Sequence, residues 1–186
     1  MRNLVIEIKK GKELPKSFIN EWNRIMYKTF KSKPLSNFEK NIFFILKKGK
    51  KIVALGELFP LTINYLSKNY NIFGIGGITA LVRKKGYGKS LIQGMIDYLR
   101  KRGKTGLGFC SKKNTLFYKK AGLKTKKELG KRFYCHKIKD EKNLSKRFHC
   151  PKSEGSGDGI YHEGKDNFLK KVLSTKSNIC LNKPLW

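Results

Sequence analysis

Acidic residues are scarce in this sequence. The 186 residues include 13 Asp and Glu against 43 Lys and Arg, which gives a formal net charge of +30 at pH 7. A charge of this sign ordinarily indicates a phosphate-bearing partner or an anionic surface. However, 36 of the cations are Lys and only 7 are Arg, and Arg is the residue suited to bidentate phosphate and guanine contacts. The scattered Lys excess favours compositional bias over a dedicated nucleic-acid function. Nucleic acid stays open as a partner through non-specific charge.

Cysteine is also rare and unpatterned. Cys110, Cys135, Cys150 and Cys180 form no Cys-x-x-Cys pair and no metal-ligand spacing with the three histidines, so we expect no metal site. Scattered cysteines without a signal peptide are typical of reduced thiols, which predicts a cytoplasmic protein. No apolar run reaches the length of a membrane-spanning helix, so we expect no membrane partner.

Most of what is present indicates one globular domain with a single core, given 186 residues of which 39% are hydrophobic. A helix is expected with Pro15 at its first position and an apolar stripe of Phe18, Trp22, Ile25 and Met26. The segment Lys28–Asn37 at its end could line a substrate mouth. Apolar runs predict strands at Asn3–Ile8, Asn41–Lys47, Lys51–Phe59, Asn71–Val82, Thr105–Cys110 and Arg132–Lys139. The stretch Leu61–Tyr70 is expected to extend or turn between two of them.

The most informative stretch is Gly76–Ser90, GGITALVRKKGYGKS. It predicts a strand, a Lys/Gly turn and then a helix whose apolar stripe is Leu91, Ile92, Met95, Ile96 and Leu99. Gly86 and Gly88 leave room for backbone N–H groups to converge before the helix N-terminus, which is where anions bind. Four cations, Arg83, Lys84, Lys85 and Lys89, add attraction. We interpret this turn as a phosphate-binding loop.

Two phosphate motifs compete for this turn. A P-loop requires G-x-x-x-x-G-K-[ST], and Gly88-Lys89-Ser90 supplies its end, but Arg83 stands where its first glycine is needed. The pattern [RQ]-x-x-G-x-[GA] fits Arg83–Gly88 in full. A nucleotide-binding enzyme of P-loop type is therefore disfavoured as an alternative.

A second motif lies downstream, where Asn114–Leu123 reads NTLFYKKAGL. Together with the R-x-x-G-x-G loop it resembles the GNAT superfamily of N-acetyltransferases, over roughly Asn41 to Lys139. The resemblance implies an α/β fold, with a mixed, mostly antiparallel central sheet flanked by helices. It also implies transfer of an acetyl group from acetyl-CoA (coenzyme A) to a primary amine by direct attack. The chain lacks the Val-x-Pro-x-aromatic sequence that usually precedes the loop.

The resemblance also implies roles for individual residues. Coenzyme A would contact Leu81, Val82, Arg83, Lys84, Lys85, Gly86, Tyr87, Gly88, Lys89, Ser90 and Asn114. A backbone N–H near Leu81 or Val82 would polarise the thioester carbonyl, and Asn114 would touch the pantetheine arm. Tyr118 would act as the acid that protonates the leaving thiolate; its alternative role is a core aromatic at a helix end.

Glu57 is the one carboxylate inside the three predicted strands Asn41–Lys47, Lys51–Phe59 and Asn71–Val82. Acetyl transfer requires a neutral amine, so a general base is useful, and Glu57 could serve if it points into the cleft. An outward-pointing Glu57 paired with one of the many lysines is the favoured alternative.

The composition shifts after residue 139. Residues 1–139 are expected to form the acetyltransferase core, and 140–186 a C-terminal extension that packs on the same domain and lines the acceptor site. Asp140–Gly159 is expected to be an exposed loop, followed by strands at Gly159–His162 and Ser177–Leu181 with a helix, Lys165–Leu173, between them. Four acidic residues could present a negative face to an amine, although polar loop residues are the favoured interpretation: Glu154, Asp158, Glu163 and Asp166. A tail that ends in Trp186 resembles that of some aminoglycoside N-acetyltransferases, which implies that it lines the acceptor pocket; the alternative is that Trp186 packs in a groove or frays.

The acceptor is left open by the sequence, and so is a choice between monomer and homodimer. Small amines, antibiotics, an amino acid, a tRNA or a protein lysine all fit. Two further alternatives are a basic nucleic-acid-binding protein without catalysis and a domain that binds coenzyme A without transfer.

Overall fold

The computed structural model describes residues 4–35, 37–135, 148–149, 156–177 and 179–181. The chain forms two compact units, one from Met1–Phe59 and Ile75–Asp97 and the other from Pro60–Gly74 and Tyr98–Leu185. Two long strands and one helix run through the boundary between them.

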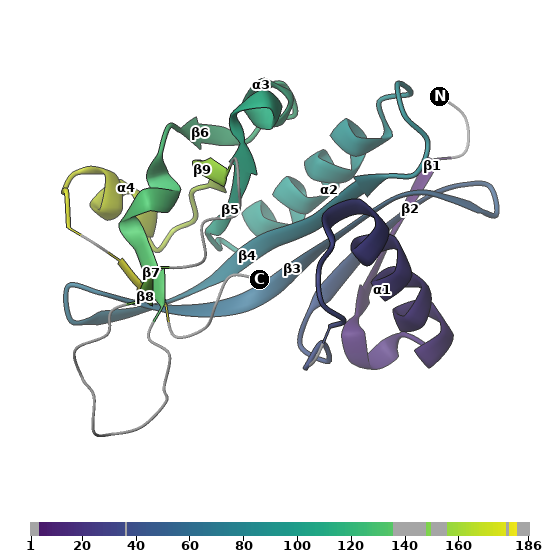
Figure 1. Cartoon of the computed structure of the whole chain (residues 1–186), viewed down its shortest axis with the longest axis horizontal. Helices are drawn as coiled ribbons and strands as arrows, with labels where there is room; N and C mark the ends of the chain where they lie inside the picture. The colour runs from purple at the N-terminus through teal and green to yellow at the C-terminus, as the bar shows by residue number, and fades with distance from the viewer. Residues whose placement is uncertain (1–3, 36, 136–147, 150–155, 178, 182–186) are drawn as a thin grey trace. The chain divides into compact units, whose positions relative to one another are not determined.

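The first unit carries two helices on a small antiparallel sheet (Figure 1). In chain order its elements are β1 (Leu4–Lys10), the 3-10 turn η1 (Gly11–Glu13), α1 (Lys16–Phe30), β2 (Ile42–Lys48), the start of β3 (Lys51–Tyr65), the end of β4 (Lys68–Ala80) and most of α2 (Tyr87–Lys101). β1 pairs antiparallel with β2, and β2 pairs antiparallel with β3.

The two faces of this sheet are covered by different helices. Strand β2 is buried from Ile42 to Leu46, as expected of a strand that is covered on both sides. On one face α1 places Ile19, Trp22 and Met26 against three strand residues: Phe43, Ile45 and Leu55. On the other face, a Cβ built on Gly56 would lie 3.0 Å from Leu91 and 3.2 Å from Met95 of α2.

The two predicted helices are present, but the buried residues and the first residue of α1 differ from the prediction. All five residues of the predicted α2 stripe are buried. In α1, Trp22 and Met26 are buried as predicted, but Ile19 joins them while Phe18 and Ile25 are only partly buried. Pro15 is the residue before the first helical residue rather than the first one.

The second unit contains the other parts of β3 and β4 and the rest of the chain. Its further elements are β5 (Gly106–Ser111), α3 (Lys112–Lys120), β6 (Lys124–Lys126), η2 (Leu129–Arg132), β7 (Phe133–Cys135), β8 (Phe148–His149), β9 (Ser156–His162), α4 (Phe168–Leu173) and β10 (Ile179–Leu181). β5 pairs parallel with β4 and antiparallel with β9, and β10 pairs antiparallel with β3 and parallel with β7. The sheet is mixed and mostly antiparallel, which confirms the predicted fold class.

Several predicted boundaries differ from the observed ones. β3 continues to Tyr65 and turns at Leu66 and Ser67, whose positive φ angles of 49° and 58° close the hairpin before β4. The expected exposed loop Asp140–Gly159 is wrong at its end, because Ser156 begins strand β9. The loop's other residues mostly lie outside the described residues, as do 136–139 of the predicted strand Arg132–Lys139 and Trp186. The division at residue 139 stays a prediction.

Within the described part of the chain, none of the helices has the length and apolar character needed to cross a membrane.

Candidate functional site

The loop between β4 and α2 has the form that the sequence predicts. It begins after Ala80, contains Lys84 and Gly86 at positive φ angles of 59° and 76°, and enters α2 at Tyr87. The first hydrogen bond of the helix runs from the Ser90 amide to the Gly86 carbonyl at 3.1 Å. The amides of residues 87–89 therefore precede that bond and have no partner inside the helix.

The space at the bend is open. A Cβ built on Gly86 would meet no atom within 4 Å, so no side chain of the described residues fills the position in front of the glycine. Arg83, Lys84, Lys85 and Lys89 are all at the surface or close to it. Free amides, the positive end of the helix dipole and four cations make this loop suited to a pyrophosphate.

Two backbone amides precede the loop, and only one is available to a ligand. The Leu81 amide donates to the Val53 carbonyl at 2.9 Å. The interpretation of the Leu81 amide as a donor to the thioester carbonyl is therefore wrong, because β3 already occupies it. The Val82 amide has no hydrogen-bond partner among the described residues.

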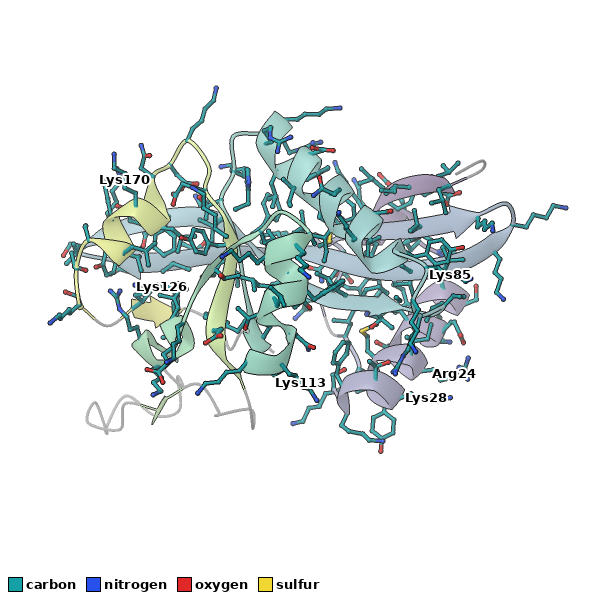
Figure 2. All side chains as sticks on the ribbon, turned by 90° about the horizontal axis from the view of Figure 1, so that it is seen from above. Arg24, Lys28, Lys85, Lys113, Lys126 and Lys170 are labelled. Carbon is teal, nitrogen blue, oxygen red and sulfur yellow. The ribbon has the colours of Figure 1, made fainter. Side chains whose placement is uncertain are left out.

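A cavity of about 540 Å³ lies where α1 faces the end of β4. Its lining residues are Glu21, Arg24, Ile25, Lys28, Thr29, Thr79, Ala80, Leu81 and Arg83. Figure 2 labels Arg24 and Lys28 on the last turns of α1, and Lys85 in the loop that follows β4. The cavity thus begins where the predicted phosphate loop begins.

Glu57 lies in the interior of the first unit, with 7% of its surface exposed. Its Oε2 accepts a hydrogen bond of 2.8 Å from the Asn41 side-chain amide. Burial raises the pKa of Glu57 to about 7, and the Asn41 hydrogen bond opposes part of that rise. The favoured alternative, an outward carboxylate paired with lysine, is therefore wrong: α1 covers this face of the sheet, and the partner of Glu57 is an amide.

A glycine lets the strand pass close to Glu57. Gly77 has a φ of +61°, and a Cβ there would lie 2.6 Å from Trp22 Cζ2 and 3.5 Å from Glu57 Oε1. Trp22 is fully buried, and its Nε1 has no hydrogen-bond partner among the described residues. Gly77 thus lies close to both the Trp22 indole ring and the Glu57 carboxylate, with no room for a side chain of its own.

Tyr118 and Asn114 lie on α3 in the second unit. They are four residues apart, so they share one face of the helix. Asn114 is exposed and Tyr118 is half-buried. Burial, reinforced by the nearby thiol of Cys110, raises the pKa of Tyr118 to about 12. Its phenol therefore stays protonated at neutral pH and is available as a hydrogen-bond donor.

A negative face was the less favoured interpretation of the acidic residues after residue 139, and the three that the structure describes are hydrogen-bonded inside the second unit. Asp158 accepts from the Thr115 hydroxyl and the Glu128 amide, at 2.8 and 3.0 Å. Asp166 accepts from the Thr105 hydroxyl at 2.6 Å, and Glu163 from the Leu169 amide at 3.1 Å. These carboxylates brace loops inside the second unit, while Glu154 lies outside the described residues.

Sequence reasoning missed the partner of Glu57 and most of the cavity lining. It placed only the segment Lys28–Asn37 at a substrate mouth, and Lys28 and Thr29 of that segment line the cavity. Arg24 and Lys28 are four residues apart on α1, so helical spacing could have placed them on one face. Asn41 and Thr79 carried no such signal, because their roles depend on which strands become neighbours. Among the described residues, no group of three or more His, Cys, Asp or Glu side chains could hold a metal ion.

Comparison with solved structures identifies the fold. The chain superposes on an acyl-CoA N-acyltransferase from Pseudomonas aeruginosa with a TM-score of 0.58 and 10% identity, covering 86% of this chain and 99% of that one. An N-acetyltransferase from Staphylococcus aureus Mu50 gives a TM-score of 0.51 and 16% identity, with coverage of 86% and 97%. A conserved protein of unknown function from Enterococcus faecalis V583 gives 0.51 and 15% identity over 67% of this chain, which spans only 36% of that longer protein.

The fold places the chain in the α/β class of proteins, with a mixed and mostly antiparallel sheet flanked by helices. The chain belongs to the Acetyltransferase (GNAT) family, whose sequence profile matches residues 11–123. The match begins about 30 residues before the resemblance read from the motifs, which started at Asn41, and includes α1. Membership implies acyl transfer from acyl-CoA to an acceptor. A search of curated proteins found no significant match to this sequence.

Proposed function

We propose that this protein is an N-acetyltransferase that moves the acetyl group of acetyl-CoA to a primary amine. The observation that carries the proposal is the open, cationic bend at Gly86, directly before a 15-residue helix, in a chain of the GNAT family. This bend offers amides and positive charge where a diphosphate is expected.

Different residues of the chain would bind different parts of acetyl-CoA, the acetyl donor. The amides of Tyr87, Gly88 and Lys89, with the side chains of Arg83, Lys84, Lys85 and Lys89, would hold the pyrophosphate. Hydrogen bonds to charged groups contribute about 1.5–3 kcal/mol each, so three or four of them suffice for a firm hold. Asn114 would contact the pantetheine arm, as the resemblance implies. The Val82 amide is the remaining donor for the thioester carbonyl.

The reaction proposed is a direct attack. The amine nitrogen forms a bond to the carbonyl carbon of the thioester, and the carbon–sulfur bond breaks as the tetrahedral species collapses. The nitrogen loses a proton to Glu57, directly or through water, and the sulfur gains a hydrogen bond or a proton from Tyr118. No covalent enzyme intermediate is needed. Glu57 would accept a proton, and Tyr118 would stabilise the negative charge on the leaving sulfur.

The pKa of Glu57 suits the base role. An alkyl ammonium with a pKa near 10.4 costs about 4–5 kcal/mol to deprotonate at pH 7. A carboxyl with a pKa of about 7 is half ionised there and is a stronger base than an exposed glutamate. The phenol of Tyr118, with a pKa of about 12, is a weaker acid than a thiol of pKa about 8.5. It therefore acts mainly by hydrogen bonding to the developing thiolate.

Two measurements test the proposal. Acetyl-CoA at millimolar concentration is expected to raise the melting temperature, and thiol release is expected when a panel of amines is added. The control is ATP with magnesium, which should not stabilise the protein unless the loop acts as a P-loop. Absence of any shift with acetyl-CoA would refute the proposed function, while a shift without turnover on any amine would indicate a domain that only binds coenzyme A.

A further inference from the structure

Asn41 lies directly before strand β2 and is the one hydrogen-bond partner that Glu57 has in the described part of the chain. Phe43 and Glu57 are directly opposite each other in the pair of β2 and β3, and Phe43 packs under α1. Residues two apart along an extended strand point to the same face, so Asn41 is directed to the α1 face as well. Its side chain, with 8% of the residue exposed, reaches Glu57 diagonally across the two strands.

The backbone of Asn41 is held by hydrogen bonds on both sides. Its amide donates to the Phe38 carbonyl at 2.9 Å, and its carbonyl accepts from the Gly11 amide at 2.8 Å. The two segments approach very closely here, because a Cβ built on Gly11 would lie 1.9 Å from the Phe38 carbonyl oxygen. Asn41 is therefore attached to the first unit through both backbone groups, which restricts where its side-chain amide can lie.

The two carboxylate oxygens of Glu57 are in different surroundings. Oε2 accepts the 2.8 Å hydrogen bond from the Asn41 amide, whereas Oε1 has no hydrogen-bond partner among the described residues. In the same part of the chain, the fully buried polar side-chain atoms that lack a partner are Trp22 Nε1, Thr79 Oγ1 and Ser111 Oγ. Oε1 is not one of them, so it keeps some contact with solvent. It lies toward β4, 3.5 Å from a Cβ built on Gly77.

Stability alone does not explain this arrangement. A buried carboxylate with one oxygen left without a partner is less favourable than an apolar side chain in the same place. The groups near Glu57 on the neighbouring elements, Asn41, Trp22 and Gly77, are uncharged. No charged side chain of the described residues contributes to the shifted pKa of Glu57. A buried, incompletely paired acid of this kind is typical of functional sites.

We propose that Asn41 is a positioning residue for the acetyl transfer, holding Oε2 of Glu57 so that Oε1 is the oxygen that takes the proton from the amine. The amide donates to Oε2, which leaves Oε1 as the free acceptor. As the amine nitrogen bonds to the thioester carbon, its N–H bond breaks, the electron pair stays on nitrogen and the proton passes to Oε1, directly or through one water molecule. This inference rests on the proposed function, because it assigns a role within that reaction.

The first test uses NMR and needs no turnover. In wild-type protein titrated from about pH 5 to 9, the Glu57 carboxyl carbon and one side-chain N–H proton of Asn41 should shift with the same midpoint, because ionisation strengthens their hydrogen bond. Asn41→Leu removes the donor at similar volume and should raise the Glu57 midpoint by about one pH unit or more. The matched control is Asn23→Leu, which removes a 3.0 Å hydrogen bond to the Leu35 amide in the same unit and should leave the midpoint unchanged.

The second test is the pH dependence of turnover. In Asn41→Leu the rising limb of kcat/KM should move to higher pH by the same amount as the NMR midpoint. On the plateau kcat should fall by about tenfold, because the carboxylate is no longer held in place. The KM for the amine should change by less than about twofold, since Asn41 does not touch the amine. A purely structural residue would lower stability without moving the limb, which is the result expected for Asn23→Leu.

Two results would overturn the inference while acetyl transfer itself remained intact. One is a wild-type Asn41 side-chain amide whose resonances do not move as Glu57 ionises. The other is a Glu57 midpoint that falls in Asn41→Leu, since Asn41 would then be accepting a hydrogen bond from the protonated carboxyl instead of donating one.

The proposed function fails by a different result, namely that the wild-type protein acetylates no amine. Coincident NMR midpoints would in that case identify the pair of Asn41 and Glu57 as a structural hydrogen bond, and the role of Asn41 in catalysis would fall together with the proposed function.

Discussion

Glu57 is the residue whose chemistry the fold changes most. On an exposed strand it would be an ordinary carboxylate, paired with one of the many lysines. Here the side chain is buried, with Gly77 passing close to its carboxylate, and Asn41 gives it one hydrogen bond. Because the charged form is poorly solvated in this environment, the pKa of Glu57 rises to about 7.

The first prediction concerns catalysis at Glu57. Glu57→Gln should lower kcat by about 100-fold or more, the range expected when a general base is lost. In the wild type kcat/KM should rise between pH 6 and 8 with an apparent pKa near 7, because the ionised form is the base. The variant should lose this limb of the pH profile. An unchanged profile would remove Glu57 from the base role.

The second prediction concerns stability at the same residue. The folded state keeps the proton on Glu57 up to a pKa of about 7, against 4.5 for the free side chain. The wild-type free energy of unfolding should therefore fall as the pH rises from about 4.5 to 7, by up to about 3 kcal/mol. Glu57→Gln cannot ionise and should lose this pH dependence. Urea unfolding of both proteins at pH 5 and pH 8 measures the difference.

Tyr118 carries the third prediction at the scale of a residue. Tyr118→Phe should lower kcat by about tenfold or more and change the Kd for coenzyme A by less than about twofold, because the phenol acts only when the sulfur departs. Tyr27→Phe is the matched control, since Tyr27 is 60% exposed on α1. Stopped-flow turnover with calorimetric binding separates the two constants. An equal loss in both constants would make Tyr118 a binding residue instead.

At the scale of the element, the turn from β4 to α2 depends on one glycine. Gly86 has a φ of +76° with open space in front of it, so glycine is required by the backbone conformation and by ligand access rather than by crowding. Gly49, in the hairpin between β2 and β3, has a φ of +57° and equally open space. The two glycines differ in their position in the fold: Gly86 precedes the N-terminus of α2, whereas Gly49 lies in a hairpin between two strands.

This pair provides the fourth prediction. Gly86→Ala and Gly49→Ala should each destabilise the protein by about 1–2 kcal/mol, the cost of a left-handed conformation for a residue with a Cβ. Only Gly86→Ala should also raise the Kd for coenzyme A, by about tenfold, because the methyl group and the strained backbone disturb the amides. Thermal melts and calorimetry on both variants test this. Equal coenzyme A affinity in the two variants would contradict the assignment of the loop.

At the scale of the whole molecule, the net charge of +30 acts on both stability and binding. Like charges repel in the compact state, and the same field attracts anionic ligands of any kind. Affinity for nucleic acid at low salt is therefore expected whether or not it has a role. The informative comparison is whether that affinity persists selectively at physiological salt.

The fifth prediction follows from screening. Raising KCl from 0.05 to 0.5 M should raise the melting temperature of the free protein, since self-repulsion is screened. It should also weaken the binding of coenzyme A, since the attraction of the loop for phosphates is screened as well. Melts and calorimetry over a salt series show whether the two effects run in opposite directions. Salt-independent coenzyme A binding would mean that the backbone amides, not the cations, hold the donor.

The glycine turn after β4 and the helix that follows it could be predicted from the sequence alone. The Arg83–Gly88 motif, the glycine bend and the apolar stripe of α2 each involve residues that are close together in the chain. The spacing of such residues in the sequence is therefore enough to predict their local conformation. The mixed sheet and the family also followed, because two motifs stood in the required order. The match of residues 11–123 to the GNAT family agrees with both.

Only the tertiary structure decided the environment of Glu57, the hydrogen-bond partner of the Leu81 amide and the existence of the cavity. Each depends on residues that are far apart in sequence: Asn41 with Glu57, Val53 with Leu81, Lys28 with Arg83. Strand alternation says that a side chain points to one of two faces, but not which helix covers that face. The burial that sets the pKa of Glu57, and the cavity beside the end of β4, exist only once the strands and α1 have packed together.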